Sequence, residues 1–150
     1  MTMVIRTFTK ADEAAVVALW RAAGLTRPWN DPHADIARKQ TVQPELFLVG
    51  ELGGEIIASA MAGYDGHRGS VYYVAVSPDH QRRGHARALM AEVEIRLEAL
   101  GCPKLNLMVR HDNSAAMGFY ERLGYDTQAV ATLGKRLIVD EPADQAATSG

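Results

Sequence analysis

The stretch from Ser70 to Arg87 constrains the fold more than any other part of the chain. Residues 71–76 are rich in β-branched and aromatic side chains, as expected for a buried strand. A Ser-Pro-Asp turn and a loop containing Gly84 follow. Apolar side chains then recur at helical spacing, at Ala86, Leu89, Met90, Val93, Leu97 and Leu100. The pattern predicts a strand that leads through a glycine loop directly into a helix.

The loop at this junction has the features of an anion site. The first backbone N–H groups of a helix lack intrahelical partners, and the helix dipole places partial positive charge there. Gly84 has no side chain to block a phosphate, and Ala86 has a small one. Arg82, Arg83 and Arg87 add charge that can bind phosphate oxygens in a bidentate manner. We therefore predict a diphosphate-binding loop; the alternative is an ordinary strand–helix turn with solvated arginines.

Length, charge and cysteine content narrow the class of protein. A chain of 150 residues suits one domain with its own core, and a net charge of −2 argues against a general nucleic-acid-binding protein. Cys102 is the only cysteine, which excludes an internal disulfide and a cysteine-only metal site, and we expect no metal. The apolar run at 14–20 is short and bracketed by charged residues. We therefore expect a cytoplasmic protein without membrane contact.

The other patterns predict a mixed sheet with helices on its faces. Further strands are expected at 4–8, 46–52, 55–64, 105–109, 125–130 and 133–139. Further helices are expected after the capping box at 9–12, at about 33–41, and from Asp112 or Asn113 to Leu123. Gly53-Gly54 suits a two-residue hairpin turn. We expect a single domain at 1–139 and a flexible tail at 140–150.

Two motifs together resemble the GCN5-related N-acetyltransferase (GNAT) superfamily. Residues 81–86, Gln-Arg-Arg-Gly-His-Ala, match the signature Q/R-x-x-G-x-G/A. Residues 113–125 resemble the motif N-x-x-A followed by F-Y-x-x-x-G-F/Y. The predicted order of elements fits that family up to about Val139. The Gly-Tyr-Asp-Gly-His-Arg-Gly turn at 63–69 is similar to that of a bacterial subgroup of these acetyltransferases.

The resemblance implies a mostly antiparallel sheet whose central strand diverges from the next one, with helices on both faces. It also implies acetyl-coenzyme A as co-substrate, with its pantetheine arm in that gap. The backbone of Val74, Ala75 and Val76 would pair with the arm. The pyrophosphate would be held by the loop, which comprises Arg82, Arg83, Gly84, His85, Ala86 and Arg87.

The second motif would complete the coenzyme site. Asn113 would hydrogen-bond a pantetheine amide, Ala116 would belong to the same binding set, and Tyr120 would face the thioester sulfur. Asn113 as a simple helix cap and Tyr120 as a structural core residue remain alternatives, because both positions suit those roles.

The resemblance implies direct attack of a primary amine on the thioester in a ternary complex. A backbone N–H near Val74 would stabilise the oxyanion, and Tyr120 would act as general acid. Relatives that act on ribosomal proteins carry a glutamate base at the position of Met108, and methionine cannot accept a proton. The base is therefore open between a water and four side chains, which are those of Asp65, His67, Tyr72 and Tyr73.

The absence of a glutamate at position 108 affects which acceptor amine we expect. At pH 7.4, about one-fifth of an α-amine with a pKa near 8 is neutral. For a lysine amine with a pKa near 10.4, the neutral fraction is only about one in a thousand. We therefore predict a peptide N-terminal or small-molecule amine. Its pocket would include Arg27, Trp29, Asn30 and Asp31, and the alternative for Trp29 is a lid packed on the sheet edge. A non-catalytic acetyl-CoA or CoA-binding module is the alternative function. An exposed edge among the closing strands allows a homodimer.

Overall fold

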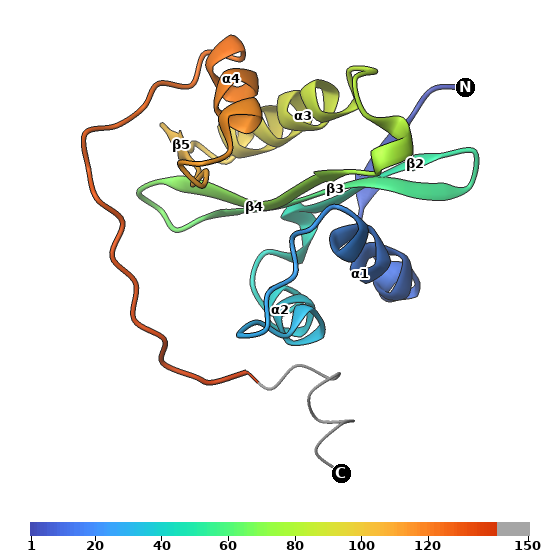
Figure 1. The fold of residues 1–150 in the computed structure, drawn as a ribbon, viewed down its shortest axis with the longest axis horizontal. Coiled ribbons are helices and arrows are strands. Elements are labelled where there is room, and N and C mark those ends of the chain that lie inside the picture. The colour runs from blue at the N-terminus through green and yellow to red at the C-terminus, as the bar shows by residue number, and fades with distance from the viewer. Residues whose placement is uncertain (141–150) are drawn as a thin grey trace.

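The computed structural model describes residues 1–140, which form a five-stranded sheet in the spatial order β1-β2-β3-β4-β5 (Figure 1). The strands are β1 (Val4–Thr7), β2 (Phe47–Leu52), β3 (Glu55–Tyr64), β4 (Gly69–Val76) and β5 (Leu105–Asn106). Neighbouring strands are antiparallel except β4 and β5, which are parallel. The predicted mixed, mostly antiparallel sheet is confirmed.

Helices cover both faces of the sheet, as the sequence predicted. Helices α1 (Glu13–Ala22) and α2 (Pro32–Lys39) lie on one face, and α3 (His85–Ala99) and α4 (Ser114–Arg122) lie on the other (Figure 1). Three short 3₁₀ turns, η1 (Lys10–Asp12), η2 (Pro44–Leu46) and η3 (Pro78–His80), connect the elements.

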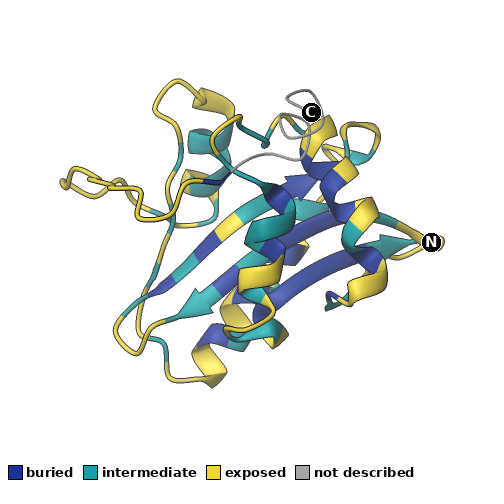
Figure 2. Cartoon of the chain, turned by 90° about the horizontal axis from the view of Figure 1, so that it is seen from below, coloured by how far each residue is buried: buried dark blue, intermediate teal, exposed yellow. Residues whose placement is uncertain are grey.

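The sheet separates two apolar cores because successive side chains of a strand point to opposite faces. On the α1 face, Trp20 packs with Phe47 and Val49 of β2. On the α3 face, Leu48 of the same strand packs with the apolar stripe of α3. Figure 2 shows the resulting dark band of buried residues along the central strands. Both faces of β2 and β3 are therefore fixed by packing.

The predicted apolar stripe of α3 is confirmed at four positions, which are Leu89, Met90, Val93 and Leu97. The prediction was wrong at Leu100, whose side chain is 49% exposed. The helix ends at Ala99, and Leu100 is its C-cap residue.

The C-terminal third departs most from the sequence-based prediction. β5 covers 105–106 instead of 105–109, and no strand forms at 125–130 or 133–139 within the described residues. A strand is stabilised mainly by its neighbours, and β5 offers only a two-residue ladder. Residues 126–139 instead run exposed from α4 to α2, where the chain reaches the buried Asp140 (Figure 1). Residues 141–150 of the predicted tail lie outside the described part of the chain.

No helix within residues 1–140 combines the length and apolar character needed to cross a bilayer.

Candidate functional site

The free edge of β4 is the first feature of the site. β4 pairs with β5 only at Gly69–Leu105 and Ser70–Asn106, so the two strands diverge beyond Ser70. Residues 71–76 keep β3 as their neighbour on the other side, but have no strand beside them on this edge within the described residues. Their backbone groups can therefore pair with an extended ligand, as an added strand would. The predicted splay of the central strand is confirmed.

A β-bulge interrupts the pairing of β4 with β3. Ser59 pairs with Ala75 and Met61 pairs with Tyr72, so a single residue of β3 faces Tyr73 and Val74. Tyr73 has φ +53°, which is unusual for a residue with a side chain. Such a bulge redirects the backbone groups of the strand at the site where it occurs.

A buried relay of hydrogen bonds holds the bulge in place. The indole Nε1 of Trp20 donates to Ser59 Oγ at 2.9 Å, and Ser59 Oγ donates to the carbonyl of Tyr73 at 2.8 Å. The Tyr73 ring also stacks on Trp20 with a centroid distance of 3.7 Å. Because Ser59 and Trp20 are fully buried, the bulge is anchored to the core of the α1 face.

The Tyr73 hydroxyl leads from the bulge to a carboxylate on α2. It donates to Asp35 Oδ2 at 2.6 Å. Burial and the neighbouring Asp35 raise the pKa of Tyr73 well above its usual range, so the phenol stays protonated at neutral pH. Tyr73 is therefore poorly suited to be the base. Asp35 was missed by sequence reasoning, because only tertiary packing brings α2 against β4.

The glycine loop lies at the start of α3. Gly84 is the N-cap of this helix, has φ +83°, and provides no side-chain cap. A Cβ placed on Gly84 would meet nothing within 4 Å, so the approach to the helix start is open. The amides of residues 84–87 have no intrahelical acceptor, as in any first helical turn. This arrangement fits a coenzyme diphosphate.

The charge around the loop also suits an anion. Arg82, Arg83 and Arg87 are exposed, and none of the three forms an ion pair with another described residue. Arg82 itself has φ +64°, which turns the chain just before the glycine. The loop therefore offers unneutralised positive charge beside open backbone amides.

The second predicted motif forms the start and middle of α4. Asn113 Oδ1 accepts from the Ala116 amide at 3.1 Å, so the predicted capping role is confirmed. The Tyr120 ring packs edge-on against Phe119 and Tyr125, and burial raises its pKa. Asn113 capping leaves its Nδ2 group able to donate to a ligand.

Tyr120 and the free edge of β4 meet at one cavity. The cavity has a volume of about 1280 Å³ and is bounded by β5, α4 and the end of α3. Tyr120 lines it together with Ser70 and Tyr72 of β4, and with Met108 beyond β5. Residues 82–87 do not line this cavity. Val74, Ala75, Val76, Asn113 and Ala116 do not line it either, so Tyr120 is the one predicted donor-site residue at this cavity.

Asp65 has a structural role in the turn before β4. Its Oδ1 accepts the amides of His67 and Arg68, each at 2.8 Å. These bonds lower the pKa of Asp65, with the Arg68 amide contributing most, and make the carboxylate a weaker base. The side chain therefore holds the hairpin turn.

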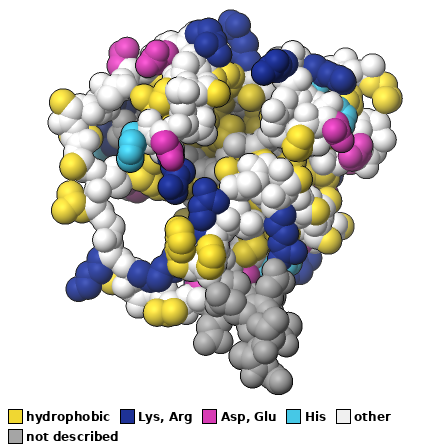
Figure 3. Space-filling view, in the orientation of Figure 1, with side chains coloured by type: hydrophobic (Ala, Val, Ile, Leu, Met, Phe, Trp, Pro, Cys, Tyr) yellow, Lys and Arg dark blue, Asp and Glu magenta, His cyan; other side chains and the backbone are white. Residues whose placement is uncertain are grey.

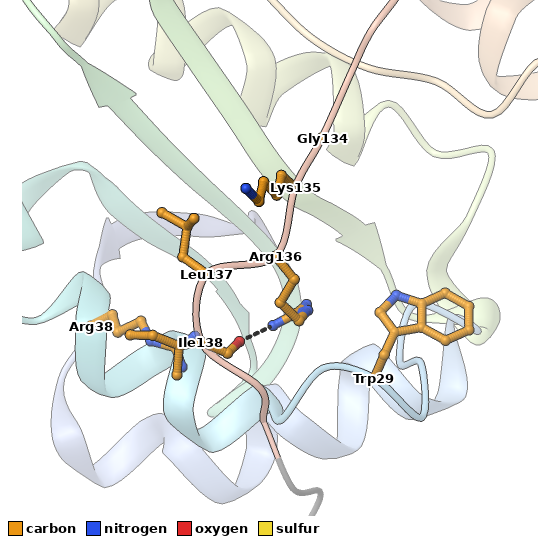
Figure 4. Close-up of a pocket in the computed structure, with 7 residues that line it drawn as sticks. All are labelled: Trp29, Arg38, Gly134, Lys135, Arg136, Leu137 and Ile138. Carbon is orange, nitrogen blue, oxygen red and sulfur yellow. Dashed lines mark hydrogen bonds between the residues drawn. The ribbon is translucent and has the colours of Figure 1, made fainter.

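The predicted acceptor segment between α1 and α2 lies beside a second pocket (Figure 4). Trp29 is 56% exposed and lines this pocket of about 580 Å³ with Arg38 and residues 134–138. Arg27 instead donates to the carbonyls of its own loop, and Asp31 caps α2 through the His33 amide. Sequence reasoning did not foresee that 134–138 would form the opposite wall, because that contact joins distant segments.

Among residues 1–140, no group of three or more His, Cys, Asp or Glu side chains is arranged to hold a metal ion. Cys102 lies at the turn between α3 and β5, where its Sγ is 3.4 Å from the carbonyl of Lys104.

Comparison with known proteins gives consistent relationships. Residues 14–125 match the family model described as "Acetyltransferase (GNAT) family". Acetyltransferase YE1169 of Yersinia enterocolitica is 56% identical over 139 residues, which cover 93% of this chain and 99% of that protein.

Two solved structures are also similar. The ribosomal-protein-S18-alanine N-acetyltransferase of Escherichia coli has a TM-score of 0.73 and 28% identity, covering 85% of this chain and 80% of its own. AAC(6')-Iy, solved with the bisubstrate analogue CoA-S-monomethyl-acetylneamine, has a TM-score of 0.75 at 19% identity, covering 91% and 99%. At 19% identity, the likeness to AAC(6')-Iy shows a shared fold.

Proposed function

Since the chain belongs to the GNAT acetyltransferase family, we propose that it is an N-acetyltransferase that moves the acetyl group of acetyl-CoA to a primary amine. The proposal depends above all on the free edge of β4 at 71–76, which runs towards the open glycine loop of α3. A pantetheine arm needs such an edge, and a diphosphate needs such a loop. We take residues 1–139 as one catalytic domain.

The donor would be held mainly by backbone groups. Val74, Ala75 and Val76 would pair with the pantetheine arm, and the amides and arginines of 82–87 would bind the diphosphate. Asn113 would donate its Nδ2 group to a pantetheine amide, with Ala116 in the same set. Acetyl-CoA supplies an activated thioester, which an amine attacks directly while both are bound.

Three features would serve the chemistry. The backbone N–H groups at the bulge would stabilise the negative charge that develops on the carbonyl oxygen. Tyr120, kept protonated by its raised pKa, would donate to the departing sulfur. Asp35 would accept the proton that the amine loses, with its two carboxylate oxygens positioned by the Tyr73 hydroxyl and by Arg38.

The pocket beside Trp29 supports an amine at a chain end or on a small molecule as acceptor. The exposed indole of Trp29 and residues 134–138 form walls of this pocket. A weakly basic amine is more easily neutralised than a lysine amine, for which the free energy of neutralisation at pH 7.4 is about 4 kcal/mol.

The test is an amine panel incubated with acetyl-CoA while thiol release is recorded. We expect turnover with α-amines or small-molecule amines, and little with lysine side chains. Asp35→Asn should lower kcat by about 10²- to 10⁴-fold, because the amide cannot accept the proton of the amine. Asp65→Asn, which alters a carboxylate that holds a turn, should retain the wild-type kcat.

Two results would count against this mechanism. Tight acetyl-CoA binding without thiol release for any amine would favour the non-catalytic module. Equal rates for Asp35→Asn and wild type would remove Asp35 from the mechanism while leaving the acetyltransferase assignment intact.

A further inference from the structure

The cavity at the edge of β4 begins where the proposed path of the donor ends. Residues 74–76, which would pair with the pantetheine arm, do not line the cavity, whereas Ser70 and Tyr72 of the same strand do. β4 runs from Ser70 towards the loop at 82–87, so an arm that enters at the loop reaches residues 74–76 first. Its sulfur would therefore come to lie at the mouth of the cavity.

Tyr120 marks the same point from the side of α4. It lines the cavity, and it is the side chain that would donate a proton to the departing sulfur. The arm would approach the thioester along β4, and the amine would approach from Asp35, which does not line the cavity. The acyl group is then left to point into the cavity, where the methyl group of acetyl-CoA would fill only a small part of about 1280 Å³.

The walls of this cavity carry a set of apolar side chains. Its aliphatic and methionine side chains are Leu105, Leu107, Met108, Val109, Met117, Leu123 and Val130. Leu105, Leu107 and Leu123 also pack on the core of the α3 face, so the wall continues from that core. Met108 and Val130 are 59% and 79% exposed, and an aliphatic chain that covered them would remove apolar surface from water.

The charged side chains at the cavity are mostly acidic. The carboxylates of Glu94, Glu98, Glu121 and Asp126 line it, against one lysine, Lys104, and one histidine, His111. Lys104 Nζ donates to Gln128 Oε1 at 2.9 Å. Figure 3 shows hydrophobic and acidic side chains together at the end of the molecule where α4 and β5 lie. A carboxylate at the end of an acyl chain would be repelled here, whereas a neutral aliphatic chain would not.

We propose that this cavity binds the aliphatic chain of an acyl-CoA donor longer than acetyl-CoA, such as butyryl-CoA or hexanoyl-CoA. The inference rests on the proposed function and adds a class of donor to it. In the transfer, the amine nitrogen bonds to the acyl carbonyl carbon, and the bond from that carbon to sulfur breaks. CoA leaves as the thiol with the proton of Tyr120, the amine proton passes to Asp35, and exchange with water restores both side chains.

The first test is calorimetric titration of the wild type with acetyl-, butyryl-, hexanoyl- and succinyl-CoA, without an acceptor. Burial of one methylene group tightens binding about fourfold, so butyryl-CoA should have a Kd about tenfold lower than acetyl-CoA. Hexanoyl-CoA should bind more tightly still. Succinyl-CoA has the chain length of butyryl-CoA but ends in a carboxylate, and it should bind no better than acetyl-CoA.

Variants of two cavity residues locate the chain. Met108→Glu lies at an exposed side chain, so the change removes no core packing, and Met117→Glu places a charge on the α4 wall. In each variant, the ratio of the acetyl-CoA Kd to the hexanoyl-CoA Kd should fall about tenfold or more. Met108→Leu and Met117→Leu keep an apolar wall and should keep the ratio. Val42→Glu, at a residue 60% exposed and outside the cavity, should keep it too.

The titrations separate this inference from the proposed function. If hexanoyl-CoA binds no better than acetyl-CoA, or if both glutamate variants keep the wild-type ratio, the cavity does not hold the acyl chain. Acetyl-CoA binding with thiol release would in that case leave the acetyltransferase function standing. Failure of every acyl-CoA to bind would overturn both.

A steady-state measurement distinguishes the acyl chain from the acceptor as occupant of the cavity. With an amine that accepts acetyl groups, the KM of the amine should stay within about twofold from acetyl-CoA to hexanoyl-CoA, because the two ligands occupy separate places. If the KM of the amine rose steadily with donor chain length, the two would compete for the cavity, and the inference would be wrong.

Discussion

Tyr120 and Tyr125 are neighbours with similar burial but different hydroxyl contacts. Their rings meet edge-to-face with centroids 5.7 Å apart. Tyr125 donates its hydroxyl to Glu94 Oε2 at 2.6 Å, which ties α4 to α3. Tyr120 lines the cavity at the β4 edge, and no described residue accepts from its hydroxyl. At the residue scale, Tyr120 therefore has a proposed chemical role, whereas Tyr125 has a structural one.

We expect Tyr120→Phe to lower kcat by about 10²- to 10⁴-fold, because the departing sulfur would lose its proton donor. Acetyl-CoA affinity, measured by isothermal titration calorimetry, should change little because ring packing is retained. Tyr125→Phe is the matched control, and it should keep kcat while losing some stability with the Glu94 hydrogen bond. Equal kcat in Tyr120→Phe and wild type would exclude the general-acid role.

Asp12 gives a prediction about acid stability. The Arg6 side-chain hydrogen bond, at 2.8 Å, lowers the pKa of Asp12 to about 2, and the Thr9 amide adds to the effect. A lowered folded-state pKa means that the stabilisation is present above the ordinary value near 4 and is lost as the pH falls towards 2. Asp12→Asn should therefore reduce the free energy of unfolding by about 2 kcal/mol at pH 7.

Urea unfolding at two pH values checks this sign. The difference between Asp12→Asn and wild type should fall to a small part of its value at about pH 2, where the native carboxylate is about half protonated and the unfolded one almost fully protonated. Asp112→Asn is the control, because that carboxylate is exposed and lies 3.7 Å from its arginine partner. It should change stability by less than about 0.5 kcal/mol at either pH. If the difference in unfolding free energy between Asp12→Asn and wild type stayed constant with pH, the ion-pair explanation would be wrong.

At the scale of elements, α3 starts at the glycine loop where the sequence predicted it, and the proposed donor role of that loop can be tested there. Gly84 and Gly66 provide a controlled comparison, because both have positive φ, +83° and +93°, and a Cβ added at either would meet no atom within 4 Å. Gly84→Glu should weaken acetyl-CoA binding at least about a hundredfold, since a carboxylate would occupy and repel the diphosphate site. Gly66→Glu carries the same backbone strain in the hairpin before β4 and should bind normally. Similar affinities in the two variants, by calorimetry, would discredit the loop assignment.

Elements defined by local patterns were predictable, and those defined by distant partners were not. The hairpin of β2 and β3, the stripe of α3 and the cap at Asn113 depend on residues within a few positions of each other. The strands expected at 125–130 and 133–139 had suitable side chains, but β5, the strand at that end of the sheet, is only two residues long. The contact of Asp35 with Tyr73 was likewise invisible, because 38 residues separate them and no spacing rule connects them.

At the scale of the whole molecule, the sheet separates two sets of groups. The glycine loop and Tyr120 belong to the α3–α4 face, whereas Asp35 and Trp29 belong to the α1–α2 face (Figure 1). The free edge of β4 adjoins both, and its bulge is anchored to the α1 core through Ser59. A donor on one face and an acceptor on the other would therefore meet at the gap between β4 and β5. In the proposed chemistry, the position of the splayed strand β4 therefore matters more than any single side chain.

Donor binding should accordingly stabilise the whole fold. A ligand that binds only the native state at one hundred times its dissociation constant adds about 2.7 kcal/mol. For a domain of this size, such a gain should raise Tm by about 5–10 °C.

Acetyl-CoA should therefore shift the melting curve of the wild type, whereas ATP and NAD, which lack a pantetheine arm for the β4 edge, should shift it much less. Gly84→Glu should lose the acetyl-CoA shift while Gly66→Glu retains it. Equal shifts from all three nucleotides would mean that the loop recognises phosphate alone, and that the β4 gap contributes nothing to donor recognition.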